Sequence, residues 1–507
     1  MKETKISGPF LDPKACYAAM RAHDARFDGR FFCGVSSTGI YCRPICRVRV
    51  PREENCTFFV SAAAAEAAGY RPCLRCRPEP APGLAPVDAM TRLAGSVAWQ
   101  VEEGGMGSRS LKDLAARVGI SERHLRRVFQ AQFGVPPVRY LQTYRLLLAK
   151  NLLSDTRLSV TDVAMAAGFG SIRRFNHLFW TRYHLAPSKM RKQIGGSVQN
   201  CDAVTLSLSY RPPYAWGSII SFLCARALPG VESVCGGVYR RAVALKKGET
   251  VYRGWISVAD RPERSGLCVT LATSLLPVLS QVLTRVRVLF DLNCDPEKVR
   301  EKLAGMDELL PGVYVAGIRA PGCFDPFEIS VRAILGQQIT VKAATTLSMR
   351  LAHLLGDKVD TPFEELRYAF FGPERILALA GPIENHLGPV GINGGKARSI
   401  FGLAQALTAG AITLSHGANP EETMDSLGRL RGFGPWTVHY IALRALGWPD
   451  AFPHTDFGVR KALAERSCGE ILELSKKWSP WRSYATVLLW NFLAKESKDD
   501  KKRSSTQ

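Results

Sequence analysis

The sequence predicts a multidomain α+β protein made of four folded parts: a small α+β domain, an all-α domain, a β-rich subdomain and a second all-α subdomain. Three observations support this prediction. The chain of 507 residues is far longer than a single hydrophobic core can serve. Residues 77–83, with three prolines, and residues 193–197, polar with two glycines, are typical of linkers. The segments that they separate differ in character: first cysteine-rich, then a helical repeat, then alternating apolar residues, and last a long helical stretch.

These boundaries divide the chain into five segments. The C-terminal segment is almost wholly polar and charged, which is typical of a disordered tail. The predicted segments are residues 1–80 for the cysteine-rich domain, 85–195 for the helical repeat, 203–310 for the β-rich subdomain, 311–495 for the second helical subdomain and 496–507 for the tail.

The charge of the chain favours a polyanionic partner. Lys and Arg number 67 against 45 Asp and Glu, so the formal net charge is +22. Such a balance indicates nucleic acid before a membrane surface, with solubility alone as the alternative. No apolar run approaches the roughly 18 residues of a membrane span, and the first ten residues lack a signal sequence. We therefore expect a cytoplasmic protein with reduced cysteines, and clustered cysteines there indicate metal binding or catalysis.

Seven of the 14 cysteines precede the first linker, and four of these have the spacing of metal ligands. Cys42 and Cys46 form one short chelating loop, and Cys73 and Cys76 form another. One zinc ion requires four tetrahedral ligands, which two such loops supply with little strain. Buried apolar cysteines and a purely structural zinc are the alternatives. Arginines that a structural site does not need surround the loops, and they suit DNA phosphates; they are Arg43, Arg47, Arg49, Arg52, Arg71, Arg75 and Arg77.

The runs RFFCGVSSTGIYCRPICRVR and AAGYRPCLRCRPE resemble the N-terminal domain of the Ada adaptive-response family over residues 10–80. In that family the first cysteine of the C-R-P-x-C loop both binds zinc and accepts a methyl group from a DNA methylphosphotriester. The resemblance implies this role for Cys42, with Cys46, Cys73 and Cys76 as the other zinc ligands.

Residues 108–190 contain one pattern twice, about fifty residues apart. Ser110 to Asp113 and Ser159 to Asp162 are both S-x-x-D, which opens a helix. A glycine turn and a basic helix follow each, and the apolar Leu125, Val128 and Phe129 recur as Phe175, Leu178 and Phe179. This is the helix-turn-helix plan, and the pair resembles the AraC-type regulators. The residues expected to contact DNA are Arg123, Arg126 and Arg127 in one copy and Arg173, Arg174, Asn176 and His177 in the other.

The C-terminal half departs from Ada, because the P-C-H-R run of its alkylguanine methyltransferase is missing from the sequence. Instead, Leu430 to Thr437 (LRGFGPWT) predicts a glycine turn between two helices, which exposes backbone N–H groups to a DNA phosphate. Together with DAFPHTD at 450–456 it resembles the helix-hairpin-helix glycosylases. YRPPYAW at 210–216, FEISVRAILGQ at 327–337 and WRSY at 481–484 extend the resemblance to the AlkA 3-methyladenine glycosylases over residues 205–493.

This second resemblance implies the roles of the site residues. Asp456 is the catalytic carboxylate that stabilises the oxocarbenium-like sugar; its alternative is a helix cap. A flipped, electron-poor base would stack on aromatic pocket residues, which are Phe222, Trp436, Tyr440 and Trp490. Gln338 stands where the family inserts an apolar wedge into the duplex, and Arg431 replaces the usual proline of the hairpin. The remaining hairpin residues expected to contact DNA are Gly432, Gly434 and Thr437.

The whole chain is therefore interpreted as an Ada–AlkA fusion: a methyl acceptor, a transcription regulator and a monofunctional glycosylase for alkylated bases. The alternative from another class is a regulator whose glycosylase half is inactive and only docks on DNA. The expected partners are double-stranded DNA, both alkylated and at promoter sites, and RNA polymerase, without a membrane. The expected location is a bacterial cytosol or nucleoid.

Overall fold

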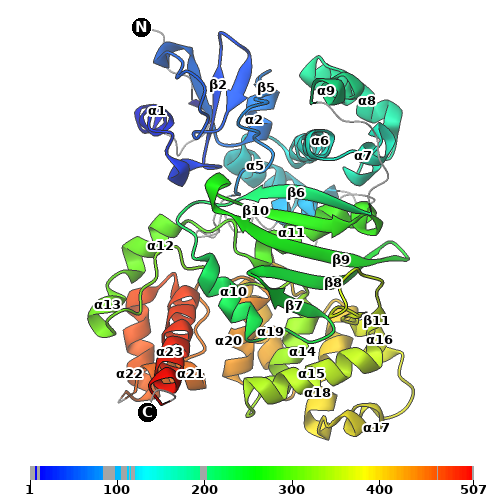
Figure 1. The fold of residues 1–507 in the computed structure, drawn as a ribbon, viewed down its shortest axis with the longest axis vertical. Helices are drawn as coiled ribbons and strands as arrows, with labels where there is room; N and C mark the ends of the chain where they lie inside the picture. Colours follow the sequence, from blue (N-terminus) through cyan, green and yellow to red (C-terminus); the bar gives the residue numbers. More distant parts are fainter. Residues whose placement is uncertain are drawn as a thin grey trace.

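The computed structural model describes residues 6–7, 12–83, 97–103, 111–112, 115, 120–194, 202–464 and 466–504. Figure 1 shows the cysteine-rich domain and the helical repeat side by side at one end of the molecule. A central antiparallel sheet separates them from two groups of helices at the other end (Figure 1). The fold is multidomain α+β, as predicted. Within the described part of the chain, no helix is long and apolar enough to cross a bilayer.

The N-terminal domain is a five-stranded sheet in the order β1-β4-β2-β3-β5 with two helices. Its helix α2 is rich in alanine and follows β4 directly in sequence. Cysteines make up much of its buried interior. The elements are β1 Ile6–Ser7, α1 Pro13–Arg21, β2 Phe32–Val35, β3 Ile40–Cys42, β4 Cys56–Phe59, α2 Ala62–Ala67 and β5 Arg71–Pro72.

The second domain is helical, and its caps follow the predicted signals. The side chain of Ser159 accepts a hydrogen bond from the backbone N–H of Asp162 at the start of α7. Ser121 and Ser171 cap α5 and α8 in the same way. The S-x-x-D signal of the first copy, at 110–113, lies outside the fully described residues. The elements are α5 Glu122–Phe133, α6 Pro137–Asp155, α7 Val160–Ala166, α8 Ile172–Tyr183 and α9 Pro187–Ile194.

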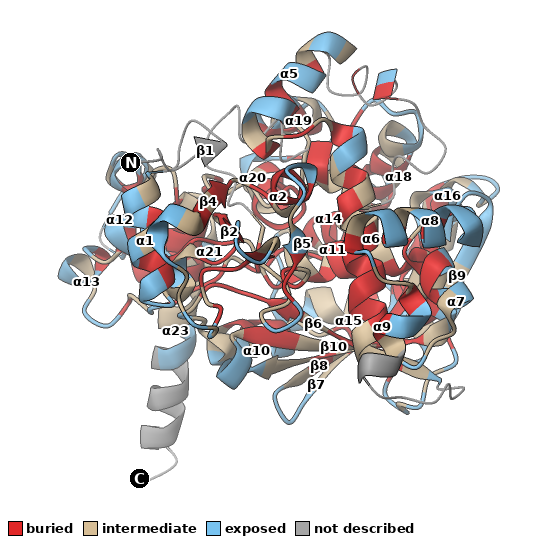
Figure 2. Cartoon of the chain, turned by 90° about the horizontal axis from the view of Figure 1, so that it is seen from above, coloured by how far each residue is buried: buried red, intermediate tan, exposed pale blue. Residues whose placement is uncertain are grey.

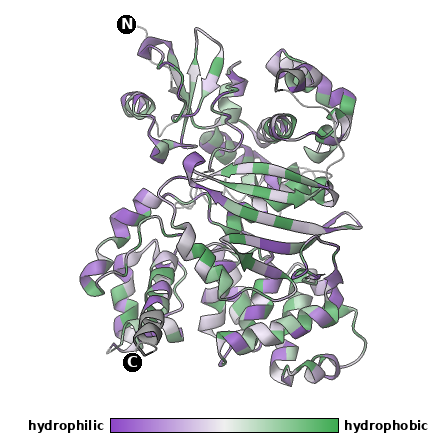
Figure 3. Ribbon diagram, in the orientation of Figure 1, coloured by the Kyte–Doolittle hydropathy of each residue, from purple (hydrophilic) through white to green (hydrophobic). Residues whose placement is uncertain are grey.

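The β-rich subdomain is an antiparallel sheet in the order β6-β10-β9-β8-β7. Alternate residues of β6, Val204, Leu206 and Leu208, are buried, and Figure 3 shows hydrophobic and hydrophilic residues mixed along these strands. Helix α11 packs on the sheet through its own apolar residues. The elements are β6 Ala203–Ser209, α10 Trp216–Cys224, β7 Glu232–Cys235, β8 Val238–Lys247, β9 Thr250–Arg261, β10 Gly266–Ala272 and α11 Leu279–Leu289.

The remaining helices form two groups with separate cores. One group contains α14 Pro326–Gly336, α15 Val341–Leu355, α16 Pro373–Leu377, α17 Ile383–Leu387, α18 Gly394–Thr408, α19 Pro420–Gly428 and α20 Pro435–Arg444. The other contains α12 Pro296–Leu303, α13 Met306–Leu309, α21 Phe457–Ala462, α22 Cys468–Ser475 and the N-terminal part of α23 Arg482–Ser504.

Three details differ from the sequence prediction. Val299, Leu303 and Met306 pack in the core of α21–α23, so α12 and α13, which lie within the predicted β-rich segment 203–310, contact the helical subdomain. The predicted all-α subdomain contains a short hairpin, β11 Asp357–Lys358 with β12 Tyr368–Ala369. Its loop lies at the edge of the large sheet, where the carbonyl of Gly230 accepts from the N–H of Arg367 and Tyr368.

The third difference is the C-terminal tail, which was predicted to be disordered from 496. Helix α23 continues to Ser504. Lys, Glu and Arg have high helix propensity, so this polar stretch can extend a helix that its apolar N-terminal half has already anchored.

Figure 2 shows buried residues gathered through the middle of the molecule, while the outward sides of α5, α8 and α10 are exposed. One buried cluster contains side chains from α6–α9 together with those of the large sheet. The cysteine-rich domain contacts α6 through α2. The helical domain therefore packs against both the cysteine-rich domain and the large sheet.

Candidate functional sites

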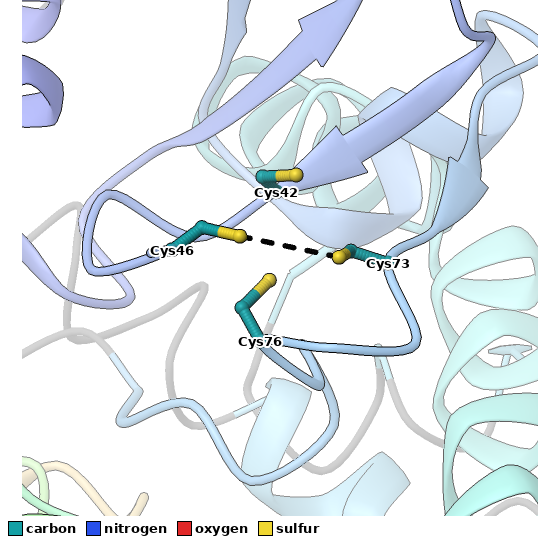
Figure 4. Close-up of side chains that lie close together, drawn as sticks. All are labelled: Cys42, Cys46, Cys73 and Cys76. Carbon is teal, nitrogen blue, oxygen red and sulfur yellow. Dashed lines mark hydrogen bonds between the residues drawn. The ribbon is translucent and has the colours of Figure 1, made fainter. Parts of the chain in front are cut away.

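The four predicted ligand cysteines meet at one place in the N-terminal domain. Cys42 ends β3, Cys46 lies in the loop that follows, and Cys73 and Cys76 lie after β5. Figure 4 shows the four Sγ atoms pointing toward one another. All four lie within 4.8 Å of each other, and the Sγ atoms of Cys46 and Cys73 are 4.0 Å apart.

This geometry fits a tetrahedral zinc ion. A Zn–S bond of about 2.3 Å sets neighbouring sulfurs about 3.8 Å apart, close to the separation of Cys46 and Cys73. Backbone N–H groups support the cluster, since those of Arg43 and Arg75 each lie 3.4 Å from a sulfur, of Cys76 and Cys73 respectively. Three of the four cysteines are buried and Cys76 is half-buried. When bound, zinc would keep these sulfurs as thiolates.

The prediction that the side chain of Arg43 contacts DNA is wrong. Arg43 is only 4% exposed, and its guanidinium forms a bidentate ion pair with Asp28, which is 2% exposed. The same guanidinium donates hydrogen bonds of 3.2 Å to the carbonyls of Cys76 and Arg77. Arg43 therefore holds the two cysteine loops together through these carbonyls, and its ion pair compensates the buried charge of Asp28.

Arg77 also has an internal role. Its guanidinium pairs with Asp155 on α6 and with Glu79. The other arginines around the cluster are exposed: Arg47, Arg49, Arg52, Arg71 and Arg75. Of these, Arg52 forms an ion pair with Glu54.

Arg211 also fixes the N-terminal domain to the C-terminal half of the chain. The sequence analysis named this residue only as part of the YRPPYAW motif. Arg211 is 1% exposed and donates hydrogen bonds to four backbone carbonyls. They belong to Asp28 and Gly83 on one side and to Asn293 and Cys294 on the other. Because Asp28 also binds Arg43, the outer support of the cysteine cluster reaches into the other half of the chain.

Glu66 joins the cysteine domain to the helical domain. Its buried carboxylate accepts hydrogen bonds from the hydroxyls of Tyr41, Thr143 and Tyr183. Tyr41 precedes Cys42, and Tyr183 ends α8. Burial raises the pKa of Glu66 to about 7, although these hydrogen bonds and Arg182 oppose the rise.

The two basic helices present most of the predicted DNA-contacting residues to solvent. Arg173, Arg174 and Asn176 on α8 are exposed. On α5, Arg123 is exposed. Arg126 forms an ion pair with Glu122, and Arg127 forms a hydrogen bond of 3.0 Å with Nδ1 of His124. Of the repeated apolar residues on α8, Phe175 and Phe179 are fully buried and Leu178 is half-buried, so they form the side of the helix that faces the core.

Asp456 is both the N-cap of α21 and the centre of a cluster of aromatic side chains. Its Oδ1 accepts hydrogen bonds from the N–H groups of Gly458 and Val459, at 2.8 and 3.1 Å. The indole of Trp490 donates to the same oxygen at 2.8 Å, and the indole of Trp436 donates to Oδ2 at 2.7 Å. Gly458 is needed here, because a Cβ would lie 2.8 Å from the Trp490 ring. The four donors hold the carboxylate in one orientation.

The four predicted pocket residues come together around this carboxylate. Trp436 stacks on Tyr440 with ring centroids 5.2 Å apart, and Phe222 stacks on Trp490 at 5.9 Å. Tyr440 lies 6.2 Å from Trp490 at an angle of 47°. A base stacked between two parallel rings needs a separation of roughly 7 Å, so these two rings must adjust to admit one.

Two arginines beside these rings were missed by the sequence analysis. The guanidinium carbon of Arg226 lies 3.9 Å from the Phe222 ring centroid, and that of Arg444 lies 4.9 Å from it. Arg444 also donates to the hydroxyl of Tyr440 at 3.0 Å. The spacing of Phe222 and Arg226, one helical turn apart, was the available signal.

The predicted hairpin lies between α19 and α20. Gly432 has φ +88, and a Cβ there would lie 2.2 Å from the hydroxyl of Ser399, so only glycine fits. Gly432 and Gly434 are exposed, and the N–H groups at the start of α20 have no acceptor within the helix. The hydroxyl of Thr437 does not face DNA, contrary to the prediction: the side chain is buried and accepts from Gln337 at 2.8 Å.

Gln338 lies at the tip of the loop between α14 and α15, exposed and with φ +58. The loop is tied to the hairpin, because Nε2 of Gln337 also donates to the carbonyl of Gly432 at 2.8 Å. Lys396 donates to the carbonyls of Leu335 and Gln337 from the other side. The next residue, Ile339, is 38% exposed and supplies an apolar side chain beside the polar tip.

Three domain families match along the chain. The metal-binding domain of Ada matches residues 15–79, a helix-turn-helix domain matches 114–193, and the AlkA N-terminal domain matches 205–325. A probable bifunctional transcriptional activator/DNA repair enzyme AlkA of Mycobacterium tuberculosis is 35% identical over 493 residues, which is 95% of this chain and 97% of the relative. The chain belongs to this family of bifunctional transcriptional activators and DNA repair enzymes.

Two relatives correspond to the separate halves of this family. DNA-3-methyladenine glycosylase 2 of Escherichia coli is 34% identical and covers 56% of this chain and 96% of its own length. The bifunctional transcriptional activator/DNA repair enzyme Ada of the same organism is 35% identical over 30% of this chain and 42% of its own length. The predicted Ada–AlkA fusion is confirmed: an Ada methyl-acceptor domain with a four-cysteine zinc cluster, a helix-turn-helix region and an AlkA-type glycosylase region.

Proposed function

We propose that this chain repairs alkylated DNA by two separate reactions, methyl transfer to Cys42 and excision of alkylated bases at Asp456. The observation that carries the proposal is that each half of the chain contains its own cluster of chemically suitable side chains. Four sulfurs converge at one site, and a carboxylate held by four N–H donors lies among aromatic side chains at the other.

In the first reaction, Sγ of Cys42 attacks the methyl carbon of a DNA methylphosphotriester. The S–C bond forms as the C–O bond breaks, and the phosphate oxygen leaves with the electron pair. Cys42 becomes a thioether and the DNA regains an ordinary phosphodiester. The exposed Arg47, Arg49 and Arg71 surround the cluster and would hold the phosphates during this step.

In the second reaction, the N-glycosidic bond of a flipped nucleotide breaks, and its electron pair goes to the base. The carboxylate of Asp456 offsets the positive charge that develops on the sugar. Water then bonds to the sugar carbon and releases a proton to solvent. Trp436, Tyr440, Phe222 and Trp490 would stack on the base, because aromatic faces favour electron-poor rings.

The excision is proposed to be monofunctional, with no cleavage of the DNA strand. Glycosylases of this superfamily that also nick DNA use a lysine in the helix after the hairpin. Trp436 stands at that position, and its indole is already engaged with Asp456. An indole N–H cannot form a Schiff base with the sugar.

The helix-turn-helix region is proposed to bind promoter DNA through the exposed side chains of α5 and α8. Arg123, Arg173, Arg174 and Asn176 are available for this. Contact with RNA polymerase belongs to the same proposal, since an activator acts through it. The hairpin would bind the damaged strand with the backbone at Gly432 and Gly434 and insert the Gln338 loop.

Two single substitutions test the reactions separately on the full chain. Asp456→Asn nearly preserves shape, and we expect it to slow base release by about a hundredfold or more, from an effect of ~3 kcal/mol, while methyl acceptance persists. Cys42→Ser should show the reverse. Asp360→Asn, an exposed carboxylate on the same half, is the matched control. Wild-type base release by Asp456→Asn would contradict the assigned carboxylate, and no base release by the wild type would indicate an inactive docking half.

A further inference from the structure

Three basic side chains from both halves of the chain lie around the second helix-turn-helix unit, which consists of α7, α8 and the turn between them. Arg145 belongs to α6, Arg174 to the first turn of α8, and Lys247 to the end of β8. Arg174 and Lys247 are exposed, and Arg145 is half-buried. All three line the same cleft between the domains, so one ligand can reach them from solvent.

Direct contacts place Arg145 between the turn and the β-rich subdomain. Gly168 lies in the turn between α7 and α8, and a Cβ added to it would lie 3.2 Å from Nε of Arg145. On the other side, a hydrogen bond of 3.2 Å joins the hydroxyl of Tyr144, the residue before Arg145, to that of Ser280 on α11. The side chain of Arg145 therefore lies where the helical domain meets α11.

The end of β8 is fixed to the same place. Gln281, the neighbour of Ser280, donates a hydrogen bond of 3.4 Å to the carbonyl of Lys246. Nζ of Lys247 donates to the carbonyl of Pro277 at 2.7 Å. Pro277 lies in the 3-10 helix Thr273–Val278, which contacts α7. These contacts hold the last two residues of β8 beside the helix-turn-helix unit.

The positive charges at this place are not balanced by acidic groups. Among the residues that the structure describes, no carboxylate forms an ion pair with Arg145, Arg174 or Lys247. Lys246 pairs with the exposed Glu249 at 3.8 Å, a contact that contributes little. Burial lowers the pKa of Arg145, and Arg174 acts in the same direction; burial and Arg145 do the same for Lys247. Like charges held together in this way favour the binding of an anion between them.

The position of the cluster identifies this anion as the backbone of the duplex that α8 binds. The first turn of a recognition helix enters the major groove, and the phosphates of the two strands flank that groove. A strand that passes the turn at Gly168 next meets Arg145 and the end of β8. Figure 1 shows the hairpin of β8 and β9 ending on the side of the molecule where α7 and α8 lie, opposite α12.

We propose that the end of β8 belongs to the promoter-binding surface, where Lys246 and Lys247, together with Arg145, hold phosphates of the DNA that α8 reads. The inference rests on the proposed promoter binding by α5 and α8, and it adds a contact from the half of the chain that carries the excision site. Phosphate contacts position a protein on a duplex without reading its sequence. The β-rich subdomain thus strengthens promoter binding without changing which site is chosen.

The test measures how tightly the full chain binds a duplex that the wild type has enriched from a random pool, at several salt concentrations. Lys246→Gln with Lys247→Gln removes two charges, and Lys246→Arg with Lys247→Arg keeps them. Lys298→Gln with Lys302→Gln, at two exposed lysines of α12, is the matched control with the same net charge.

We expect the β8 glutamine variant to bind the selected duplex about tenfold more weakly than wild type. The slope of log K against log salt should become shallower by about one to two, because each lost phosphate contact removes about 0.9. Its preference for the selected duplex over single-base variants should persist, which shows that α5 and α8 are folded. The arginine variant and the α12 control should bind like wild type.

Two results overturn the inference alone: wild-type affinity and salt slope in the β8 glutamine variant, or an equal loss in the α12 control, which would make net charge the sole cause. If the wild type enriches no sequence from the pool, the proposed promoter binding is overturned, and the inference with it.

Discussion

The indole Nε1 of Trp436 lies 2.7 Å from Oδ2 of Asp456, so one hydrogen bond joins the aromatic cluster to the carboxylate. Trp436→Phe removes the donor and keeps an aromatic face. A hydrogen bond to a charged group is worth about 1.5–3 kcal/mol, so we expect excision to slow by about tenfold or more. Binding of damaged DNA should change little. Single-turnover rates and a binding titration measure the two effects, and an unchanged rate would show that the bond has no part in catalysis.

The position of Trp436 also predicts the products of the reaction. Because the indole has no amine to trap the sugar, treatment with borohydride during turnover should leave no covalent protein–DNA adduct. The released DNA should carry an intact strand with an abasic site. Denaturing electrophoresis detects both outcomes. A trapped adduct would reveal an amine at the sugar and refute the monofunctional assignment.

The loop between α14 and α15 predicts how the duplex is opened. Ile339, with its exposed apolar side chain, should contribute more to unstacking than the polar Gln338. Ile339→Ala is therefore expected to slow excision from a paired duplex by about tenfold. It should have little effect on a lesion in single-stranded DNA, which needs no flipping. If Gln338→Ala has the larger effect, the tip residue itself is the wedge, as the sequence resemblance implies.

Glu66 predicts a pH dependence of stability. Its folded pKa of about 7 lies above the ordinary value of 4.5. A raised pKa means that its stabilising contribution is full below about pH 4.5 and is lost as the pH rises through about 7. The difference between the two pKa values corresponds to roughly 3 kcal/mol of unfolding free energy. Glu66→Gln keeps the hydrogen-bonding shape and does not titrate.

We therefore expect urea unfolding of the full chain to show a larger loss of stability between about pH 5 and about pH 8 for wild type than for Glu66→Gln. Titration of other groups is common to both proteins and cancels in the comparison. Parallel pH profiles would mean that Glu66 does not change its protonation in this range.

Methylation of Cys42 is expected to strengthen promoter binding. A thioether carries one negative charge fewer than a thiolate, so the cluster repels the phosphate backbone less. A unit charge at ~4 Å is worth on the order of 1 kcal/mol in water and several times more near a protein surface. Affinity should thus rise by about tenfold to a thousandfold. Methylated and unmethylated protein are compared on one promoter fragment at fixed salt; equal affinities would leave Cys42 as a repair nucleophile only.

The sequence predicted the cysteine cluster because chelate spacing is a local property, and Figure 4 shows the four sulfurs together. The aromatic pocket and Asp456 were predicted through family resemblance, since they come from four separate helices. The sequence analysis could not identify side chains that pair with each other from distant positions along the chain. Asp28, 15 residues from Arg43, forms a buried ion pair with that arginine, so its side chain does not reach the protein surface. Gln337 holds the side chain of Thr437 inside the protein through a hydrogen bond. Arg211 illustrates the limit, because its carbonyl acceptors come from three segments.

The boundaries of the domains show the same limit. Helices α12 and α13 follow the sheet in sequence but pack with α21–α23, which periodicity alone cannot reveal. The polar C-terminal segment has the composition of a tail and the helix propensity of a helix, and the structure continues α23 through most of it.

The most direct test of the combined repair function is mass spectrometry of the full chain after incubation with methylated double-stranded DNA. Our account predicts one added methyl group, on the peptide that contains Cys42, and no such addition in Cys42→Ser. The methyl group should appear on Cys42 in Asp456→Asn as well, because the two sites act separately. A wild-type chain that acquires no methyl group, or that carries it on a cysteine outside the cluster, would contradict the account.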